Sequence, residues 1–347
     1  MDERTQAPSR FYKKAEGGKL TCIVCERRCK LAEDRTGLCG TKVNDDGSLK
    51  TLTYGAISHA ESRPMELKPF YHFYPGKRAL TISTWGCNLT CPWCQNHHYA
   101  RVPTKIDRSV FVTPKNVVEQ ACAQGDRGIC VSFNEPTMLT EYCLDLFPLS
   151  RSFWLFNTFV TNGYQTTQCL KALKDSGLDA LNIDLKGSDH VYKEHCGGAK
   201  VAPVLRNIKD AIKMDMHVEV TNLVITEVND DEVSIDFVIK SHLKYAGPGT
   251  PLHFTRYFPA YNFQRPPTDL SILEGAVKRA RKEGVEHVYI GNVLGHEAES
   301  TYCPKCGKKV IGRSGGRMVS YALDKQCKCI GCGEKIPVLG WEMPKWK

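Results

Sequence analysis

Two kinds of segment alternate between about residues 80 and 293, and this alternation restricts the fold more than any other feature of the chain. The apolar, β-rich segments are ALTISTWG, GICVSFN, FNTFVTNG, LNIDLKG, VEVTNLVI, PLHFTRYF and HVYIGNV. Segments with helical spacing of apolar residues lie between them, such as PKNVVEQACAQ and VLRNIKDAIKM. Buried strands separated by amphipathic helices are typical of parallel sheets. The repeated βα units predict an α/β fold, either a full or partial (β/α) barrel or a doubly wound open sheet.

Polar residues follow or end the first four of these apolar segments. They are Cys87, Asn134, Glu135, Thr161, Asn162, Asp184 and Lys186. The carboxyl ends of parallel strands meet at one face, where the active sites of α/β proteins form. We therefore expect a barrel with one catalytic mouth over residues 80–297, preceded by an N-terminal module (1–79) and followed by a C-terminal tail (298–347).

The 17 cysteines are many for a chain of 347 residues, and their meaning depends on the compartment. No run approaches the ~20 apolar residues of a membrane helix, and the N-terminus has no apolar stretch typical of a signal peptide. A cytoplasmic location without a membrane partner is expected, and there clustered cysteines indicate metals rather than disulfides. The net charge of +9 comes from Lys and Arg that often lie beside Asp or Glu, so nucleic acid is not an expected partner.

Twelve of the cysteines fall into three clusters. These are Cys22, Cys25, Cys29 and Cys39; Cys87, Cys91 and Cys94; and Cys303, Cys306, Cys327, Cys329 and Cys332. The last cluster contains two CxxC pairs, Cys303/Cys306 and Cys329/Cys332, which are typical of a zinc ribbon. A rubredoxin-like iron site is the alternative there, and Cys327 could replace Cys329 as a metal ligand. The first cluster is expected to bind either zinc or an auxiliary iron–sulfur cluster, and its spacing does not decide between them.

The central cluster, Cys87-Asn-Leu-Thr-Cys91-Pro-Trp-Cys94, directly follows a predicted strand. A [4Fe–4S] cluster normally takes four thiolates. Three thiolates on one loop hold three irons and leave the fourth open to the amino and carboxylate groups of S-adenosylmethionine (SAM). One electron then breaks a carbon–sulfur bond and yields a 5′-deoxyadenosyl radical, so a reductant such as ferredoxin or flavodoxin is an expected partner. The alternative is a zinc site completed by His97 or His98.

These motifs resemble the radical SAM superfamily. The likeness is strongest to its AmmeMemoRadiSam-system branch, which is similar to pyruvate formate-lyase activating enzymes. It covers nearly the whole chain and includes CIVCERRC, KPFYHFYPG, GCNLTCPWCQN, SFNEPT, TNGY, NIDLKG, EHCGG, LHFTRYFPAY and TYCPKCG. The resemblance implies a radical SAM barrel that uses a [4Fe–4S] cluster and SAM.

The resemblance also implies roles for polar residues at the strand ends. Asn134 and Glu135 match the element that binds the SAM ammonium, where a carboxylate makes a charge-assisted hydrogen bond. The alternative for this stretch is a helix N-cap region. Thr161, Asp184 and Lys186 match positions that contact SAM or a nearby cation, with Lys186 available for the SAM carboxylate.

Two positions depart from the pattern of the family. Val160 stands where activating enzymes with a monovalent-cation site carry an acidic residue, so that cation is not expected. Phe258 stands where relatives commonly carry a histidine that contacts the SAM carboxylate. His253 and Arg256, on the same predicted strand, are the substitutes.

The strand NIDLKG places Asn182, Asp184 and Lys186 on one face, because alternate residues of a strand point the same way. Polar groups directed into a barrel are costly without partners. A ligand, an ion or mutual pairing is therefore expected, and a buried Asp–Lys pair without a ligand is the alternative. On the next strand, Glu219 and Thr221 are expected to line the ribose and adenine region, although packing explains them nearly as well.

Three functions remain open from the sequence. The first is a radical SAM enzyme that abstracts hydrogen from an unidentified substrate. The second is an activase that makes a glycyl radical on a protein partner, although the terminal cysteine modules are not needed for the simplest activase. The third is a non-enzymatic, zinc-binding adaptor, which leaves Glu135, Asp184 and Lys186 unexplained.

Overall fold

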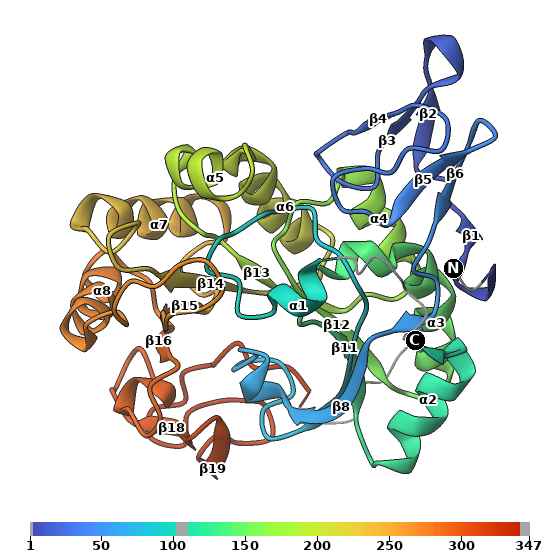
Figure 1. The fold of residues 1–347 in the computed structure, drawn as a ribbon. Helices are drawn as coiled ribbons and strands as arrows, with labels where there is room; N and C mark the ends of the chain where they lie inside the picture. The colour runs from blue at the N-terminus through green and yellow to red at the C-terminus, as the bar shows by residue number, and fades with distance from the viewer. Residues whose placement is uncertain (1–2, 102–109, 341–347) are drawn as a thin grey trace.

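An eight-stranded sheet forms the centre of the computed structural model, which describes residues 3–101 and 110–340 (Figure 1). From edge to edge its strands are β16 (Val288–Gly291), β15 (Leu252–Arg256), β14 (His217–Val224), β13 (Ala180–Asp184), β12 (Phe156–Thr161), β11 (Gly128–Val131), β9 (Arg78–Ser83) and β8 (His59–Pro64). Neighbouring strands from β9 to β16 are parallel, and β8 is antiparallel to β9. Because β8 and β16 are edge strands, the sheet is a partial barrel, and the predicted α/β fold is confirmed.

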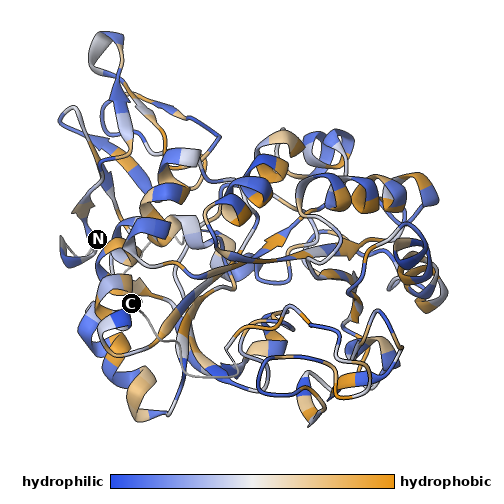
Figure 2. Ribbon diagram, turned by 180° about the vertical axis from the view of Figure 1, so that it is seen from behind, coloured by the Kyte–Doolittle hydropathy of each residue, from blue (hydrophilic) through white to orange (hydrophobic). Residues whose placement is uncertain are grey.

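Helices between the strands cover the outer face of the sheet (Figure 1). They are α2 (Pro114–Ala123), α3 (Thr140–Ser152), α4 (Thr167–Ser176), α5 (Asp189–His195), α6 (Val201–Lys213), α7 (Glu232–Tyr245) and α8 (Leu270–Lys282). The side chains of Thr113, Thr166, Asp231 and Asp269 accept backbone N–H groups at the starts of α2, α4, α7 and α8, which explains where these helices begin. In Figure 2 the sheet is mostly apolar, whereas the helices carry both polar and apolar residues. No helix of the described ranges is long and apolar enough to cross a membrane.

The N-terminal module consists of two small antiparallel sheets beside α3 and α4 (Figure 1). Their strands are β2 (Tyr12–Lys14), β3 (Leu20–Cys22) and β4 (Lys30–Leu31), and β1 (Ala7–Pro8), β6 (Ser48–Thr51) and β5 (Lys42–Asp45). A further pair, β7 (Ala56–Ile57) with β10 (Val110–Phe111), follows them. The predicted boundary at residue 79 falls inside β9, and β8, which lies before it, belongs to the same central sheet.

The C-terminal module covers the open side of the barrel. Its antiparallel sheet contains β17 (Thr301–Tyr302), β18 (Lys309–Ser314) and β19 (Arg317–Tyr321). The short helix η3 (Met65–Leu67) and the chain that follows it lie beside this sheet (Figure 1). The side chain of Arg313 donates to the carbonyl oxygen of Tyr71, and backbone hydrogen bonds join Leu339 to His72 and Tyr74. The segment after η3 and the C-terminal module are far apart in the sequence. Together they fill the lower half of the barrel, which lies at the bottom in Figure 1.

Candidate active site and metal centres

A cavity of about 260 Å³ lies at the carboxyl ends of the strands. It brings together nine of the residues predicted for the catalytic and cofactor sites. They are Cys87, Cys91, Cys94, Asn134, Glu135, Thr161, Asp184, Lys186 and Thr221. The strand ends thus meet at one cavity, as the alternating segments predicted, and its catalytic role stays a prediction.

The loop that carries the three cysteines is held from beneath by amide side chains. Asn134 accepts the backbone N–H of Thr84 at 3.1 Å and donates to the carbonyl of Gly86 at 2.8 Å. The amide of Asn162 lies 3.8 Å from the sulfur of Cys87. Since both polar atoms of the Asn134 side chain bind the backbone ahead of Cys87, its contacts within the protein fix where the cysteine loop begins.

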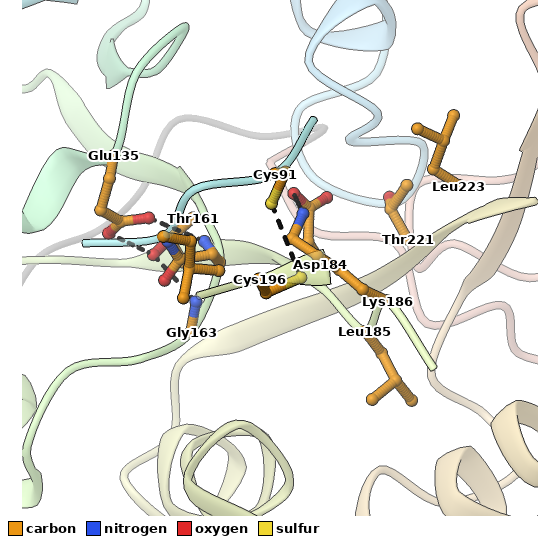
Figure 3. Close-up of polar contacts among 12 residues, drawn as sticks. Cys91, Glu135, Thr161, Gly163, Asp184, Leu185, Lys186, Cys196, Thr221 and Leu223 are labelled. Atoms are coloured by element: carbon orange, nitrogen blue, oxygen red, sulfur yellow. Dashed lines mark hydrogen bonds and ion pairs between the residues drawn. The ribbon is translucent and has the colours of Figure 1, made fainter. Parts of the chain in front are cut away.

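Glu135 is buried at one wall of the cavity and is fully hydrogen-bonded. Its carboxylate accepts from the hydroxyls of Thr137 and Thr161 at 2.5 and 2.7 Å, and from the backbone of Asn162 at 2.8 Å (Figure 3). Burial raises the pKa of Glu135, and these hydrogen bonds oppose that shift. The side chain also accepts the N–H of Thr137 at the start of η4 (Pro136–Leu139), so the helix-cap interpretation is correct for this residue. Glu135 nevertheless lines the cavity.

Asp184 and Lys186 form an ion pair of 2.9 Å on the other side of Cys91 (Figure 3). The side chain of Asp184 is 37% exposed and that of Lys186 is 14% exposed, so the pair opens into the cavity. Burial alone would lower the pKa of Lys186, but the charge of Asp184 helps to hold it well above its usual value. The lysine therefore carries a positive charge at the mouth.

Thr221 and Glu219 lie on the same face of β14 but serve different halves of the barrel. Thr221 lines the cavity and donates to Asn182 at 2.9 Å. Glu219 lies below it and accepts the backbone N–H groups of Tyr71 and His72 at 3.0 and 2.8 Å. Its carboxylate also bonds His217 and His253 at 3.0 and 2.7 Å. Glu219 thus anchors the chain that fills the barrel, and it is absent from the lining of the cavity.

Strand β15 shows the same division, and neither of the two candidates chosen from the sequence, His253 and Arg256, is among the residues that line the cavity. His253 points down to Glu219, and Arg256 donates to the carbonyl oxygen of Thr268 at 2.8 Å. Thr255, between them, lines the cavity together with Leu223 and Asn292. The alternation of side chains along the strand could have indicated Thr255. The sequence does not show how deep in the barrel each residue lies.

Cys196 lies beside the cysteine loop without facing the cavity. It is buried, and its sulfur is 3.6 Å from that of Cys91 (Figure 3). The structure therefore favours Cys196 as a hydrogen-bond partner of the Cys91 sulfur.

Comparison with known proteins decides the family. Residues 81–237 match the Radical SAM superfamily. The chain belongs to this superfamily. An uncharacterized protein of Methanocaldococcus jannaschii is 38% identical over 331 residues, which are 95% of this radical SAM chain and 98% of that protein. A probable GTP 3′,8-cyclase of Pyrococcus horikoshii is 30% identical over 159 residues, 44% of this chain and 49% of the cyclase, so the match spans about half of that enzyme.

Among solved structures, a radical SAM methyltransferase from Sphaerobacter thermophilus is similar with a TM-score of 0.49 and 12% identity, over 82% of this chain and 76% of that one. A domain of pyruvate-formate lyase-activating enzyme from Bacteroides vulgatus has a TM-score of 0.41 and 16% identity, over 48% of this chain and 99% of that one. The AmmeMemoRadiSam branch within the superfamily stays a prediction.

Radical SAM proteins use SAM and a [4Fe–4S] cluster, and the central cysteines fit such a cluster. All three line the cavity at its mouth. Within the described residues 3–101, the sulfurs of Cys87, Cys91 and Cys94 are not all within 4.8 Å of one another, as a single metal ion would require. The ring of His97 stacks on Tyr261, with centroids 4.6 Å apart. These observations favour the cluster over a zinc site completed by a histidine.

The C-terminal cysteines form a compact group of four. The sulfurs of Cys303, Cys306, Cys329 and Cys332 all lie within 4.8 Å of one another. Cys303 and Cys332 are 3.5 Å apart, and Cys306 and Cys329 are 3.7 Å apart. Four thiolates around a tetrahedral zinc ion, each about 2.3 Å from the metal, are separated by about 3.8 Å. The group therefore fits one metal ion, and it includes Cys329 rather than Cys327.

The N-terminal cysteines are arranged differently. Cys22, Cys25, Cys29 and Cys39 line one pocket in their module. Within the described stretch 3–101, no three of their sulfurs lie within 4.8 Å of one another. The four cysteines predicted to bind a metal therefore lie around one pocket. Their sulfurs are farther apart than those of the C-terminal group.

Proposed function

We propose that this radical SAM protein cleaves SAM reductively at a [4Fe–4S] cluster held by Cys87, Cys91 and Cys94, and that the resulting radical abstracts hydrogen from a substrate. The observation that carries the proposal is the single cavity that joins these thiols to Glu135 and to the Asp184–Lys186 pair. A reduced cluster with one open iron supplies the electron that breaks the carbon–sulfur bond. The residues around it must bind SAM and exclude water.

Two charged walls of the cavity suit the two charges of the methionine part of SAM. Glu135 and the Thr161 hydroxyl form the negative wall, which suits the ammonium. Lys186 forms the positive wall, which suits the carboxylate, with Asp184 orienting its ammonium at 2.9 Å. Thr221 and Leu223 lie beyond this pair and are proposed to contact the nucleoside (Figure 3). Glu219 is left out of this set because it does not line the cavity and its carboxylate binds Tyr71, His72 and His253.

The test is cleavage of SAM by the full chain. Anaerobic reconstitution with iron and sulfide, then addition of dithionite and SAM, is expected to release 5′-deoxyadenosine. Replacement of Cys87, Cys91 and Cys94 by alanine is expected to abolish this product, and replacement of the exposed Cys122 serves as the matched control. Cleavage that survives the triple replacement contradicts the proposal, and no cleavage by the wild type leaves the adaptor as the better reading.

The glycyl radical activase is the narrower alternative. It requires a partner protein, and it predicts a glycyl radical signal by electron paramagnetic resonance (EPR) when that partner is added. Turnover of a small molecule without a partner excludes it. A ferredoxin or flavodoxin as the electron donor, zinc in the C-terminal group and a cytoplasmic location belong to the same proposal.

A further inference from the structure

The N-terminal cysteine pocket has a geometry unlike that of a single-ion site. One tetrahedral ion draws four sulfurs to within about 3.8 Å of one another, as in the C-terminal group. The sulfurs of Cys22, Cys25, Cys29 and Cys39 are more widely spaced, yet they surround one pocket. In an iron–sulfur cube each thiolate binds a different iron, so the sulfurs stand farther apart. Neither the N-terminal cysteines nor the active-site trio has the close sulfur spacing of a single-ion site among the described residues.

A buried donor faces the same pocket. Asn88 lines the pocket and is fully buried. Its Oδ1 accepts from Asn162 at 2.7 Å, whereas its Nδ2 has no hydrogen-bond partner among the described residues. A buried amide without an acceptor is costly. A bound cluster would remove this cost, because its sulfur atoms accept hydrogen bonds from the protein.

Asn88 also joins this pocket to the active site, because it directly follows Cys87. Its neighbour Asn162 approaches the sulfur of Cys87 at 3.8 Å. Arg27, two residues after Cys25, donates to the carbonyl oxygens of Asn88 at 2.7 Å and Cys196 at 2.6 Å. Asn88 therefore lines the N-terminal pocket, and its chain neighbour Cys87 lines the active-site cavity.

The burial of the four cysteines differs across the pocket. Cys22 and Cys25 are buried, whereas Cys29 and Cys39 are partly exposed. Backbone pairing of Cys25 with Gln165 brings it against the barrel. One side of the pocket thus faces solvent and the other faces the active-site loop, which is the arrangement that electron transfer from an external carrier needs.

We propose that Cys22, Cys25, Cys29 and Cys39 bind a second [4Fe–4S] cluster, which passes single electrons from a reduced carrier protein of the flavodoxin or ferredoxin class to the cluster at Cys87, Cys91 and Cys94. The relay rests on the proposed function, which consumes one electron for each SAM cleaved. The carrier is oxidised by one electron and the N-terminal cluster is reduced. That cluster returns to its first state when the electron moves on, and no bond is made or broken in the relay.

The first experiment identifies the metal in the full chain. A variant with Cys87, Cys91 and Cys94 replaced by alanine is reconstituted anaerobically with iron-57 and sulfide. It is expected to keep about four irons, as one cube with four thiolate ligands by Mössbauer spectroscopy, and its reduced EPR signal should not respond to SAM. Zinc alone, or the loss of all iron, overturns the proposal. This result does not depend on SAM cleavage, so it is separate from the test of the proposed function.

The second experiment tests the relay by comparing two reductants. The rate of 5′-deoxyadenosine release with reduced flavodoxin is divided by the rate with dithionite, for the wild type and for a variant with the four N-terminal cysteines replaced by serine. A fall of this ratio by tenfold or more supports the relay, and an unchanged ratio overturns it. If the wild type releases no 5′-deoxyadenosine with either reductant, the proposed function fails instead.

A third measurement needs no N-terminal variant and therefore does not depend on the folding of that module. In the fully reduced wild type, two clusters whose pockets are joined through the neighbouring residues Cys87 and Asn88 are expected to broaden each other's EPR signals. The reference is the sharp signal of the variant that lacks Cys87, Cys91 and Cys94. A wild-type spectrum without this broadening contradicts the proposed proximity of the two clusters.

Discussion

Each terminal module gathers a group of four cysteines, with Cys327 as a fifth cysteine in the C-terminal module, but the two groups differ in geometry. The C-terminal sulfurs are all within 4.8 Å of one another, around a point suited to one ion. Val310, Ile311 and Ile336 pack beside them in a small separate core. The N-terminal sulfurs are farther apart, and Cys22 belongs to the main core of the barrel. Equal numbers of the same ligand therefore favour different metals, because the spacing of the sulfurs decides how many metal ions they can share.

The two modules also attach to opposite halves of the barrel. The C-terminal module reaches the lower half, where Arg313 contacts Tyr71 and Glu219 holds the same segment. The N-terminal module reaches the mouth of the barrel. There Arg27 donates hydrogen bonds to the carbonyl oxygens of Asn88, which follows Cys87, and of Cys196, which contacts Cys91. From this contrast we propose that a metal at the C-terminal group stabilises the fold and that a metal at the N-terminal group transfers electrons, and four predictions test how the two modules differ.

The largest effect is expected from loss of the C-terminal metal. Structural zinc sites contribute on the order of 10 kcal/mol to folding, and a tetrahedral site does not survive the loss of a ligand. Cys329→Ala is expected to lose about one zinc per chain and to expose the amides of residues 301–340 to hydrogen exchange. The iron content should not change. Cys327→Ala is the matched control and should keep its zinc, so loss of zinc from this control contradicts the assignment.

A smaller but still large effect is expected at Glu219. Removing one partner from a buried charged network costs about 3–5 kcal/mol. Glu219→Ala leaves two backbone N–H groups and two histidines without their acceptor. Its free energy of unfolding should fall by about this amount, and hydrogen exchange should rise in residues 69–74 more than in residues 20–25. The exposed carboxylate of Glu119 provides the control, with a change of less than about 0.5 kcal/mol for Glu119→Ala.

Acid is expected to loosen the C-terminal half first. Burial lowers the pKa of His287 to about 4, and its ring lies 4.5 Å from that of His72 beneath the C-terminal module. The unfolded chain binds this proton near pH 6.5, so stability falls as the pH drops from about 6.5 towards 4, by about 2 kcal/mol at pH 5. The sequence from residue 1 to 58 contains no histidine.

Hydrogen exchange at pH 7 and pH 5, corrected for the intrinsic exchange rate, measures this difference. Residues 69–74 and 285–302 should lose protection, whereas residues 20–31 should change less. His287→Gln is expected to flatten the dependence on pH. Equal loss of protection in both modules, or an unchanged slope in this variant, refutes the prediction.

The smallest effect is expected at Arg27, which joins the N-terminal module to the mouth. Arg27→Ala removes hydrogen bonds to three backbone carbonyls, worth about 1–2 kcal/mol in total. Its neighbour Arg28 is exposed and pairs with Glu26, so Arg28→Ala is the control. Chemical denaturation and hydrogen exchange at residues 20–29 should separate the two variants. Equal effects would show that Arg27 does not hold the module in place.

Much of the candidate site could be predicted because its signals are local. Cys87, Cys91 and Cys94 lie within eight residues, and Asn134, Thr161 and Asp184 each end an apolar segment. Nearby residues on one loop, or at the end of a strand, stay together in any parallel α/β fold. The depth of a residue in the barrel cannot be read from nearby residues in the sequence. For this reason Glu219 was grouped with Thr221, and His253 was chosen where Thr255 lines the cavity.

The sequence by itself determined the βα order of the chain, the three groups of cysteines and the strand ends where the mouth lies, since apolar periodicity and short spacings act within a few residues. Only the tertiary structure decided which thiols approach closely enough to share one ion. It also decided that Asn88 stands between two cysteine sites and that Glu219 belongs to the floor of the barrel. These features depend on contacts between segments far apart in the chain, such as Arg27 with Cys196 and Arg313 with Tyr71, which packing sets and local pattern does not.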